Sequence, residues 1–335
     1  FFYPMNLYLN ADCMNPETDH KFPYKWTLKD ANFTKDKGKV FSCFACGGGS
    51  TMGYKLAGFD VIGCNEIDPK MMAAYVANHN PKYSYLEPIQ TFKDRQDLPD
   101  ELFHLDILDG SPPCSSFSDA GNGKKDWGKE KKFREGQAVQ VLDTLFFDFI
   151  DLAKRLQPKV VIAENVKGIL KGEARNYYRR VLAELDAAGY YAQAVLLDAS
   201  KMGVPQRRER VFFIGLRKDL ATPFLYQHDM FTFLPRIDLN FNEAKIVFSE
   251  IMEADAPQNT MTDFKLELMA EAKYGERDLQ HACERLHGKR NNFGDKILYQ
   301  DGVCGTITSN NYETIWGENR LKTDLETIYA GAFPS

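Results

Sequence analysis

The sequence predicts a doubly wound α/β fold, and two observations carry that prediction. Strand-like segments alternate with helix-like segments from about residue 38 to residue 218, which is the pattern of repeated β-α units. Several strand-like segments are near-continuous apolar runs, such as "KVVIAENV" at 159–166, and such runs are typical of parallel strands buried on both faces. With 335 residues the chain can bury a large core, and about two domains are expected.

The expected elements follow one another along this first part of the chain. Strands are expected at 39–45, 60–68, 102–110, 159–166, 190–199 and 210–216. Helices are expected within 54–59, 69–80, 141–157 and 177–190, and a glycine-rich turn at 47–53. The helix at 141–157 stops before Pro158, and its apolar residues have helical spacing: Val141, Leu142, Leu145, Phe146, Phe149 and Leu152. Gly189 closes the last helix.

The remaining residues divide into three expected parts. Residues 1–37 form an N-terminal extension that packs on the core of the main domain, 38–218. Residues 219–300 hold aromatic, proline and charged segments without a β-α rhythm, which predicts a smaller domain or a long insertion. Residues 301–335 return to the main domain, beginning with an ordered strand at 301–311.

Composition is that of an ordinary soluble globular protein, with 44% hydrophobic and 27% charged residues. No apolar run approaches the roughly 18–20 residues that cross a bilayer, so no membrane span is expected. The N-terminus lacks a basic region before its apolar residues and lacks an initiator Met, which predicts no signal peptide and a trimmed chain. The net charge of −5 neither indicates nor excludes a nucleic-acid partner, because binding needs only a local basic surface.

The cysteines favour free thiols and a reducing compartment, because they are seven, an odd number, and are scattered through a long chain. Cys43 and Cys46 form a CxxC pair, but no second pair stands at the spacing of metal ligands. No metal site is therefore expected.

The glycine-rich segment "FACGGGSTMG" (44–53) follows a strand and precedes a helix, the setting in which a turn lets the backbone approach a cofactor. The nicotinamide fingerprint G-x-G-x-x-G fails, because its third glycine, counted from Gly47, falls on Met52. Glu66 ends the second strand, where a carboxylate can accept both hydroxyls of a ribose. These residues predict a cofactor that carries a nucleoside, and a tight turn without a ligand is the alternative.

The stretch "GSPPCSSFS" (110–118) places Cys114 after two prolines and outside any apolar pattern. It follows a strand, so it lies at the sheet edge where doubly wound proteins bind ligands. The thiolate is the nucleophilic form, and with an ordinary pKa of about 8.5 roughly a tenth of a thiol is thiolate near pH 7.5. Cys114 is therefore a candidate nucleophile, with a buried loop cysteine as the alternative.

Charged residues stand at the ends of two further strands. Glu164 and Asn165 end the apolar strand at 159–166, where a carboxyl group is costly without a task or a partner. Arg208 and Arg210 stand two apart at the start of the last strand, so both are expected on one face. Paired guanidinium groups suit a phosphate or a carbonyl oxygen. Each cluster alone fits a surface salt bridge, but together they indicate a site.

These motifs, in the order "FACGGGS…NEID…GSPPCSSFS…LFFDF…PKVVIAENVKG…GVPQRRERVFFIG…GTITS", resemble those of the DNA (cytosine-5)-methyltransferases. The resemblance covers roughly residues 38–218 and 301–311. It implies a Rossmann-like sheet that binds S-adenosylmethionine and releases S-adenosylhomocysteine, without a metal. Residues 38–218 would then be the catalytic and cofactor-binding domain, and 219–300 the target-recognition domain.

The resemblance implies a covalent mechanism on a cytosine flipped out of duplex DNA. Cys114 would attack C6 of the base, Glu164 would hold or protonate N3, and Asn165 would help to fix that loop. Arg208 and Arg210 would steady the base and the catalytic loop. C5 would take the methyl group, and loss of the C5 proton and of the thiol would release 5-methylcytosine.

The resemblance also implies binding residues. The implied cofactor contacts are Phe44, Ala45, Gly47, Gly48, Gly49, Glu66, Ile67, Pro112 and Leu145. A segment from Ser118 to about Gln140 resembles the mobile loop that closes over the flipped base, and its excess of positive charge suits phosphates. The implied DNA contacts are Ser118, Lys124, Lys125, Lys132, Arg134, Gln206, Lys289, Arg290 and Asn291.

The sequence departs from the family pattern at several positions. Cys46 stands where a glycine is usual, Ser42 where an aspartate is common and Ser115 where a glutamine is frequent. Pro88 stands where an acidic residue would contact adenine. The closing Gly-Asn segment of the last motif is missing after "LKTDLETIYAGAFPS", so we expect a truncated chain or a second polypeptide that supplies it.

We therefore expect a DNA (cytosine-5-)-methyltransferase of a restriction-modification system, an orphan enzyme or a phage enzyme. It would act in the cytoplasm of a bacterial or phage-infected cell, as a monomer unless a second polypeptide completes it. A tRNA cytosine-5 methyltransferase and a catalytically silent DNA-binding member are the alternatives, although intact Cys114 and Glu164 argue against silence. A nicotinamide dehydrogenase would leave the Pro-Cys and Glu-Asn-Val elements unexplained. The DNA sequence recognised cannot be read from these motifs.

Overall fold

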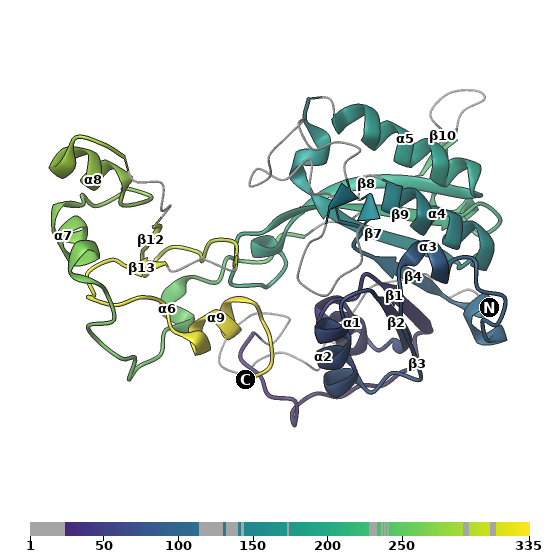
Figure 1. Ribbon diagram of the computed structural model, residues 1–335, viewed down its shortest axis with the longest axis horizontal. Coiled ribbons are helices and arrows are strands. Elements are labelled where there is room, and N and C mark those ends of the chain that lie inside the picture. The colour runs from purple at the N-terminus through teal and green to yellow at the C-terminus, as the bar shows by residue number, and fades with distance from the viewer. Residues whose placement is uncertain are drawn as a thin grey trace. The chain divides into compact units, whose positions relative to one another are not determined.

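The computed structural model describes residues 24–113, 130–131, 140–141, 144–172, 174–227, 233–235, 237, 239, 241–290, 295–308 and 313–335. The chain forms two compact units (Figure 1). The sheet unit comprises Asn32–Leu197 and Glu209–Leu239, and the second unit comprises Phe1–Ala31, Asp198–Arg208 and Asn240–Ser335. The chain thus leaves the sheet unit at Asp198, returns at Glu209 and leaves again at Asn240. The domain boundaries expected from the sequence stay a prediction.

A seven-stranded sheet in the order β3-β2-β1-β4-β7-β9-β8 forms the centre of the sheet unit (Figure 1). Its strands are β1 (Lys39–Cys43), β2 (Asp60–Glu66), β3 (Tyr83–Leu86), β4 (Ile107–Gly110), β7 (Val160–Val166), β8 (Tyr190–Asp198) and β9 (Glu209–Arg217). From β3 to β7 neighbouring strands run parallel, and β9 runs antiparallel to β7. The predicted doubly wound α/β fold is confirmed, with one reversed strand.

Helices cover both faces of this sheet. They are α1 (Gly49–Leu56), α2 (Pro69–His79), α3 (Ile89–Phe92), α4 (Leu145–Leu156) and α5 (Ala174–Ala187). Side chains alternate along β1: Val40 belongs to a cluster with Tyr54 of α1, whereas the Phe41 ring stacks on Phe92 of α3 at 5.4 Å. This period of two places α1 and α3 on opposite faces.

The main core lies between the sheet and α4. The rings of Phe146 and Phe149 from α4 are buried, and Phe146 meets Phe213 of β9 edge-on at 5.2 Å. Removing such a side chain from water stabilises the fold by about 1.5–3 kcal/mol. The carboxyl ends of β1, β4 and β7 are therefore held by a rigid support.

The second unit is smaller and more irregular. Its helices and strands are α6 (Phe248–Ile251), α7 (Asp263–Glu271), α8 (Gln280–His287), α9 (Asp324–Ala330), β12 (Ile297–Leu298) and β13 (Thr314–Ile315). Phe248, Ile251 and Ile315 belong to one buried cluster. As expected, the described part of 219–300 shows no β-α rhythm; it includes a short antiparallel pair in the sheet unit, β10 (Leu225–Gln227) and β11 (Phe233–Pro235).

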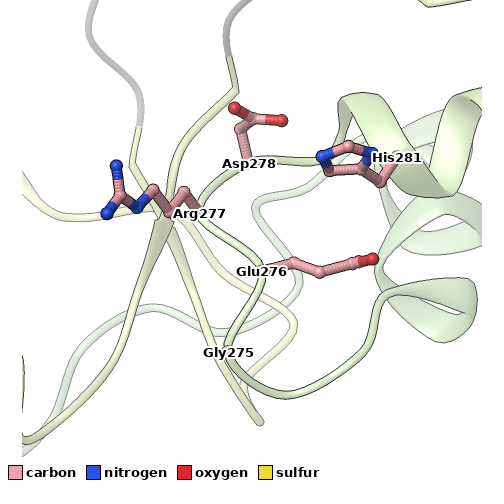
Figure 2. Close-up of a pocket in the computed structure, with 5 residues that line it drawn as sticks. All are labelled: Gly275, Glu276, Arg277, Asp278 and His281. Atoms are coloured by element: carbon pink, nitrogen blue, oxygen red, sulfur yellow. The ribbon is translucent and has the colours of Figure 1, made fainter.

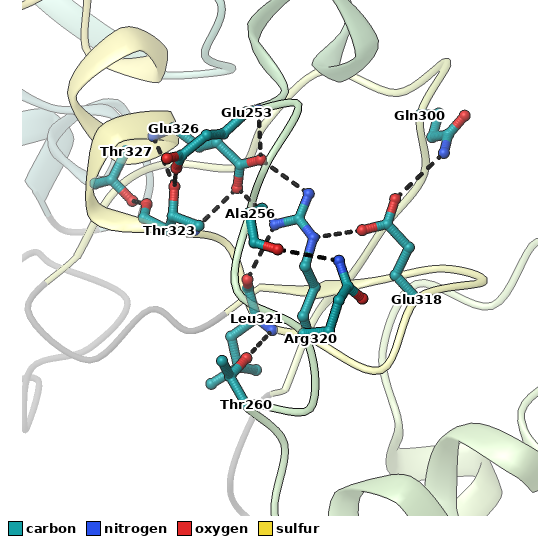
Figure 3. Close-up of polar contacts among 11 residues, drawn as sticks. Glu253, Ala256, Thr260, Gln300, Glu318, Arg320, Leu321, Thr323, Glu326 and Thr327 are labelled. Carbon is teal, nitrogen blue, oxygen red and sulfur yellow. Dashed lines mark hydrogen bonds and ion pairs between the residues drawn. The ribbon is translucent and has the colours of Figure 1, made fainter.

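A buried ion pair ties together distant segments of the second unit (Figure 3). Arg320 is 1% exposed and donates from both terminal nitrogens to the carboxylate of Glu326, at 2.9 Å each. The same carboxylate accepts from the backbone N–H groups of Glu253 at 3.0 Å and Thr323 at 2.9 Å. The start of α9 is therefore joined to the segment after α6.

Four expected elements differ from the structure. The strand expected at 102–110 begins only at Ile107, because Asp100–His104 form a 3₁₀ turn after Pro99 that buries Leu102. The helix expected at 141–157 begins at Leu145; Val141 lies in a two-residue strand β6 (Gln140–Val141), paired with β5 (Glu130–Lys131). Leu142 lies outside the described residues.

The other two differences involve glycines. Helix α1 begins at Gly49, inside the expected turn, because Gly48 turns the chain with a φ of +89°. The strand expected at 301–311 is an isolated bridge from Cys304 to Gln206 within the described part, 301–308. There the Gly305 N–H donates to the side chain of Glu313, at 2.7 Å, instead of to a strand.

Candidate active site

Four chain segments meet at the carboxyl edge of the parallel strands. Cys43 of β1 pairs with Asn65 of β2 and with Gly110 of β4, and Gly110 pairs with Ala163 of β7. Each strand ends within a few residues of this row. The glycine-rich turn, Glu66, the Pro112 segment and Glu164 are therefore neighbours, as the sequence predicted for parallel strands.

The glycine-rich turn after β1 is held by Glu66. Phe44 and Cys46 have positive φ, 53° and 46°, which twists the backbone of the turn. The Glu66 carboxylate accepts from the backbone N–H of Cys46 at 2.7 Å, of Ile67 at 2.8 Å and of Asp68 at 2.9 Å. Because Glu66 is 5% exposed, these three amides compensate a buried charge.

His79, at the end of α2, packs against the same turn. A Cβ at Gly48 would lie 2.1 Å from Nε2 of His79, so no side chain fits there. Burial lowers the pKa of His79, and its Nδ1 has no hydrogen-bond partner among the described residues. The neutral ring therefore packs behind the turn and fills the space beside Gly48.

The other residues implied as cofactor contacts differ in their exposure to solvent. Gly47 and Gly49 are exposed, Phe44 and Ile67 are half-buried, and Ala45 is buried. The Phe44 ring lies 6.5 Å from that of Phe149. Leu145 is fully buried in the main core. These positions leave the cofactor role of each residue a prediction.

Asn165 connects β7 to the segment after β4. Its Nδ2 donates to the Pro112 carbonyl at 3.2 Å, and its Oδ1 accepts from the Val166 N–H at 2.8 Å. Asn165 is 3% exposed, so both bonds are shielded from water. Asn165 fixes the residues that lead to Cys114, which itself lies outside the described residues.

Glu164 and Arg210 form an ion pair at the same edge, with Arg210 Nε 2.9 Å from Glu164 Oε1. The reversal of β9 brings Arg210 there, because the start of an antiparallel strand lies beside the end of its neighbour. Arg208 precedes β9 and belongs to the second unit, where its carbonyl accepts from the Ala199 N–H at 3.0 Å.

Asp109, at the end of β4, is a feature of the site that the sequence reasoning missed. Its carboxylate accepts from the hydroxyls of Ser42 at 2.9 Å, Ser50 at 2.7 Å and Tyr54 at 3.1 Å. Burial raises the pKa of Asp109, although the three hydroxyls oppose the rise. The signal was a carboxyl residue inside the otherwise apolar strand "ILDG".

Most implied DNA contacts have no described structure. Those outside the described residues are Ser118, Lys124, Lys125, Lys132, Arg134 and Asn291. Gln206 is 5% exposed, and its side chain bonds to the Ala330 carbonyl and the Ile307 N–H within the second unit. Lys289 is exposed, and Arg290 pairs with Glu284 at 2.9 Å. Their DNA roles stay predictions.

The second unit has a surface hollow of about 400 Å³ (Figure 2). It is lined by Gly275, Glu276, Arg277, Asp278 and His281. Arg285 forms an ion pair with Glu276 and lowers the pKa of this carboxyl group to about 2. The negative charge of Glu276 is therefore already balanced by Arg285. The exposed Arg277 extends away from Glu276 and His281, and among the described residues its side chain has no hydrogen-bond or ion-pair partner.

The described residues include neither a cluster of metal ligands nor a membrane-spanning helix. No group of three or more His, Cys, Asp and Glu side chains in this part is arranged to hold a metal ion. No helix in it is long and apolar enough to cross a membrane.

The chain matches known proteins over most of its length. The model of the C-5 cytosine-specific DNA methylase family matches residues 38–326. The Type II methyltransferase M.NgoPII of Neisseria gonorrhoeae is 37% identical over 193 residues, 56% of this chain and 50% of that protein. The orphan methyltransferase M.Rho11sI of Bacillus phage rho11s is 33% identical over 162 residues, 48% of this chain and 29% of that protein. The chain spans about half the length, or less, of these curated relatives.

Two solved structures share the fold. A protein described as a DNA modification methyltransferase encoded within an E. coli prophage has a TM-score of 0.56 at 20% identity, over 88% of both chains. A mutant of DNMT2 from Spodoptera frugiperda has a TM-score of 0.51 at 19% identity, over 81% of this chain and 70% of that chain. At these identities the likeness concerns the fold alone.

Proposed function

Because the chain belongs to the C-5 cytosine-specific DNA methylase family, we propose that it transfers a methyl group from S-adenosylmethionine to C5 of a cytosine in duplex DNA. One observation carries the proposal. The glycine-rich turn, the Pro112 segment that leads to Cys114, and the Glu164–Arg210 pair lie together at one sheet edge. That edge would offer a turn for the cofactor and a charged partner for the base, and the segment after Pro113 would supply the nucleophile.

The residues of the turn fit the cofactor. A Cβ at Gly47 would meet no atom within 4 Å, so the backbone there is open to a ligand. Three amides fix the Glu66 carboxylate, and of its roughly four acceptor sites one remains for a ribose hydroxyl. Phe44 would lie against the adenine, and Gly47 beside the methionine part. When bound, the cofactor supplies an electrophilic methyl group.

The chain's own residues would activate the base. Cytosine C5 is too electron-poor to take a methyl group directly, so the Cys114 thiolate would bond to C6 and give C5 enamine character. Glu164 would hold or protonate N3, with its carboxylate oriented by Arg210 at 2.9 Å. After methylation, loss of the C5 proton and elimination of the thiolate would restore the aromatic ring and the free cysteine.

The base must leave the duplex to reach these groups. The lysines of 118–140, together with Lys289 and Arg290, would contact phosphates or base edges. The exposed Arg277 joins this set as a further candidate, because guanidinium groups suit both kinds of contact. We also propose that the protein belongs to a restriction-modification system or is an orphan enzyme, like its Type II and phage relatives. It would act in the cytoplasm as a monomer.

Duplex DNA that bears 5-fluorocytosine tests the proposal directly. Fluorine at C5 cannot leave as a cation, so a working enzyme supplied with S-adenosylmethionine stays covalently attached to its substrate. We expect an adduct that resists denaturation, formed by the wild-type protein and absent from Cys114→Ser. Cys283→Ala, which changes a buried cysteine of α8, is the matched control and should still form the adduct.

The outcomes are distinct. An adduct on 5-fluorocytosine RNA and none on DNA would replace the proposal with the RNA alternative. An adduct on neither nucleic acid would overturn methyl transfer by this chain. An adduct that survives Cys114→Ser would remove Cys114 as the nucleophile.

A further inference from the structure

Asp109 is a buried carboxylate that joins three segments of the sheet unit. It is the last residue but one of β4 and directly precedes the Gly110–Pro113 segment. Ser42, its register partner, lies on β1, and Ser50 and Tyr54 lie in the first and second turns of α1. All three hydroxyls donate to its two oxygens, at 2.7–3.1 Å. Asp109 is 5% exposed, and its bond to Ser42 is buried, whereas Ser50 lies at the surface.

We propose that Asp109 is a positioning residue that holds the cofactor turn and the nucleophile segment as one rigid piece. The inference rests on the proposed methyl transfer and names a part of its machinery. Ser50 is the second residue of α1, so its position sets where the glycine-rich turn ends. Asp109 likewise sets where the segment toward Cys114 begins. One carboxylate thereby fixes the start of α1 relative to the end of β4.

The surroundings leave little freedom for either segment. A Cβ at Gly110, the next residue, would lie 2.6 Å from Cε2 of Phe149, so the chain after Asp109 is wedged against α4. On the other side, His79 leaves no room for a side chain at Gly48. The Asp109 cluster lies between these two close contacts and connects them.

A carboxylate suits this position better than a neutral group. A carboxylate only accepts hydrogen bonds and can take all three hydroxyl donors at once. An amide would direct an NH₂ group toward at least one of them. The first turn of α1 also favours a negative charge nearby, because its N–H groups are not bonded within the helix. Burial without such partners would be costly, which indicates a role for the charge.

The test compares Asp109→Asn with Asp106→Asn. Asp106 lies just before β4, at the opposite sheet edge, where its carboxylate accepts from the Lys39 N–H and pairs with Lys159, both at 2.7 Å. It is a matched carboxyl change away from the site. Two quantities are measured for each variant: affinity for S-adenosylmethionine by calorimetry, and the rate of adduct formation on 5-fluorocytosine DNA.

We expect Asp109→Asn to weaken cofactor binding and to slow adduct formation by on the order of 10²-fold, the effect of a small misplacement of reacting groups. Asp106→Asn should lower only the unfolding temperature. Similar rates and affinities in the two folded variants would overturn the positioning role. The variants are compared only with wild-type protein that forms the adduct. A wild type that forms no adduct would contradict the proposed function and would be seen before any variant is measured.

Two further measurements separate positioning from general stability. Hydrogen–deuterium exchange should rise together in 48–56 and at the amides of Gly110 and Ser111 in Asp109→Asn, whether or not the protein is active, and an unchanged pattern would contradict the connection. Moving the carboxylate across the register pair, as Ser42→Asp with Asp109→Ser, should restore part of the lost rate. A folded double variant no faster than Asp109→Ser alone would count against the carboxylate as the positioning group.

Discussion

Arg210 Nε lies 2.9 Å from Oε1 of Glu164, across two strands that run in opposite directions. Arg210 pairs in register with Val166, so its side chain reaches diagonally to the residue two positions earlier on β7. Lys167, the residue after β7, forms a second ion pair with Glu209 of β9, at 2.7 Å. The Glu164 carboxylate therefore has a set direction before any substrate arrives.

Glu164→Gln should lower the single-turnover rate of methylation by roughly 10²–10⁴-fold, the range of acid–base assistance, because an amide cannot exchange a proton with N3. Arg210→Lys should lower it less, since an ammonium keeps the charge and loses the planar donor pair. Arg217→Lys, at the other end of β9 and paired with Asp219, is the control. Transfer of a labelled methyl group measures all three rates. Equal rates for the two lysine variants would remove Arg210 from the reaction.

Gly48→Ala should disrupt the glycine-rich turn, and Gly47→Ala should leave it intact. Gly48 has a φ of +89° and no room for a Cβ, whereas a Cβ at Gly47 meets nothing within 4 Å. Left-handed strain and overpacking each cost roughly 1–3 kcal/mol, so the free energy of unfolding should fall by that order in Gly48→Ala alone. Urea unfolding followed by circular dichroism compares them, and equal losses would contradict this account of the turn.

Arg320→Met should destabilise the second unit by about 3–5 kcal/mol, because it leaves the Glu326 carboxylate buried without a counter-charge. Adding Glu326→Leu should recover much of the loss, since removing both charges removes the unpaired one. Arg290→Met breaks an exposed ion pair with Glu284 and should cost about 0–1 kcal/mol. Urea unfolding monitored by tryptophan fluorescence gives the three values. An Arg320→Met variant as stable as the wild type would show that the Arg320–Glu326 pair does not stabilise the second unit.

Stability at acid pH should depend on Glu101. Hydrogen bonds from Lys39, Lys82 and Tyr83 lower the pKa of Glu101 from 4.5 to about 2. A carboxyl group whose pKa falls on folding adds stability that is present above its unfolded value and is lost as the pH drops through its folded value. Glu101→Gln should therefore be less stable than the wild type at pH 7, with a difference that shrinks between about pH 4.5 and pH 2.

Urea unfolding at a series of pH values measures this difference, with Asp100→Asn as the control. The Asp100 side chain is 92% exposed, and its carboxylate lies 3.3 Å from Nε2 of the exposed His104. A Glu101→Gln difference that stays constant down to pH 2 would show that the ion pairs do not stabilise the fold.

The strands could be predicted from the sequence because burial on both faces leaves a plain apolar signature. The run at 159–166 became β7, and it carried Glu164 and Asn165 to the predicted edge. Asp68 and Pro69 likewise mark the start of α2, where the Asp68 side chain accepts from two backbone N–H groups. A local sequence pattern is enough to predict a feature that depends on one helix or strand alone.

Features that depend on two elements could not be predicted. The direction of β9 leaves no mark in its apolar pattern, so the contact between Arg210 and Glu164 was not foreseen. Asp109 lies in a strand as expected, but its hydrogen bonds were not foreseen, because its hydroxyl partners lie 55 to 67 residues away in the chain. The 3₁₀ turn at 100–104 could not be distinguished from a strand either. Leu102 and Leu105 are buried, and their apolar pattern fits both conformations.

The reversed strand has a consequence for which changes in chain length the protein tolerates. Arg210 is the second residue of β9, and the chain enters β9 from the short excursion Asp198–Arg208. One residue inserted there, if absorbed by a shift of β9, would turn Arg210 to the other face of the sheet and bring Glu209 into its position, beside the like charge of Glu164. Natural variants should therefore keep the length of 198–208 constant, while insertions and deletions accumulate in the irregular stretch that begins at residue 240.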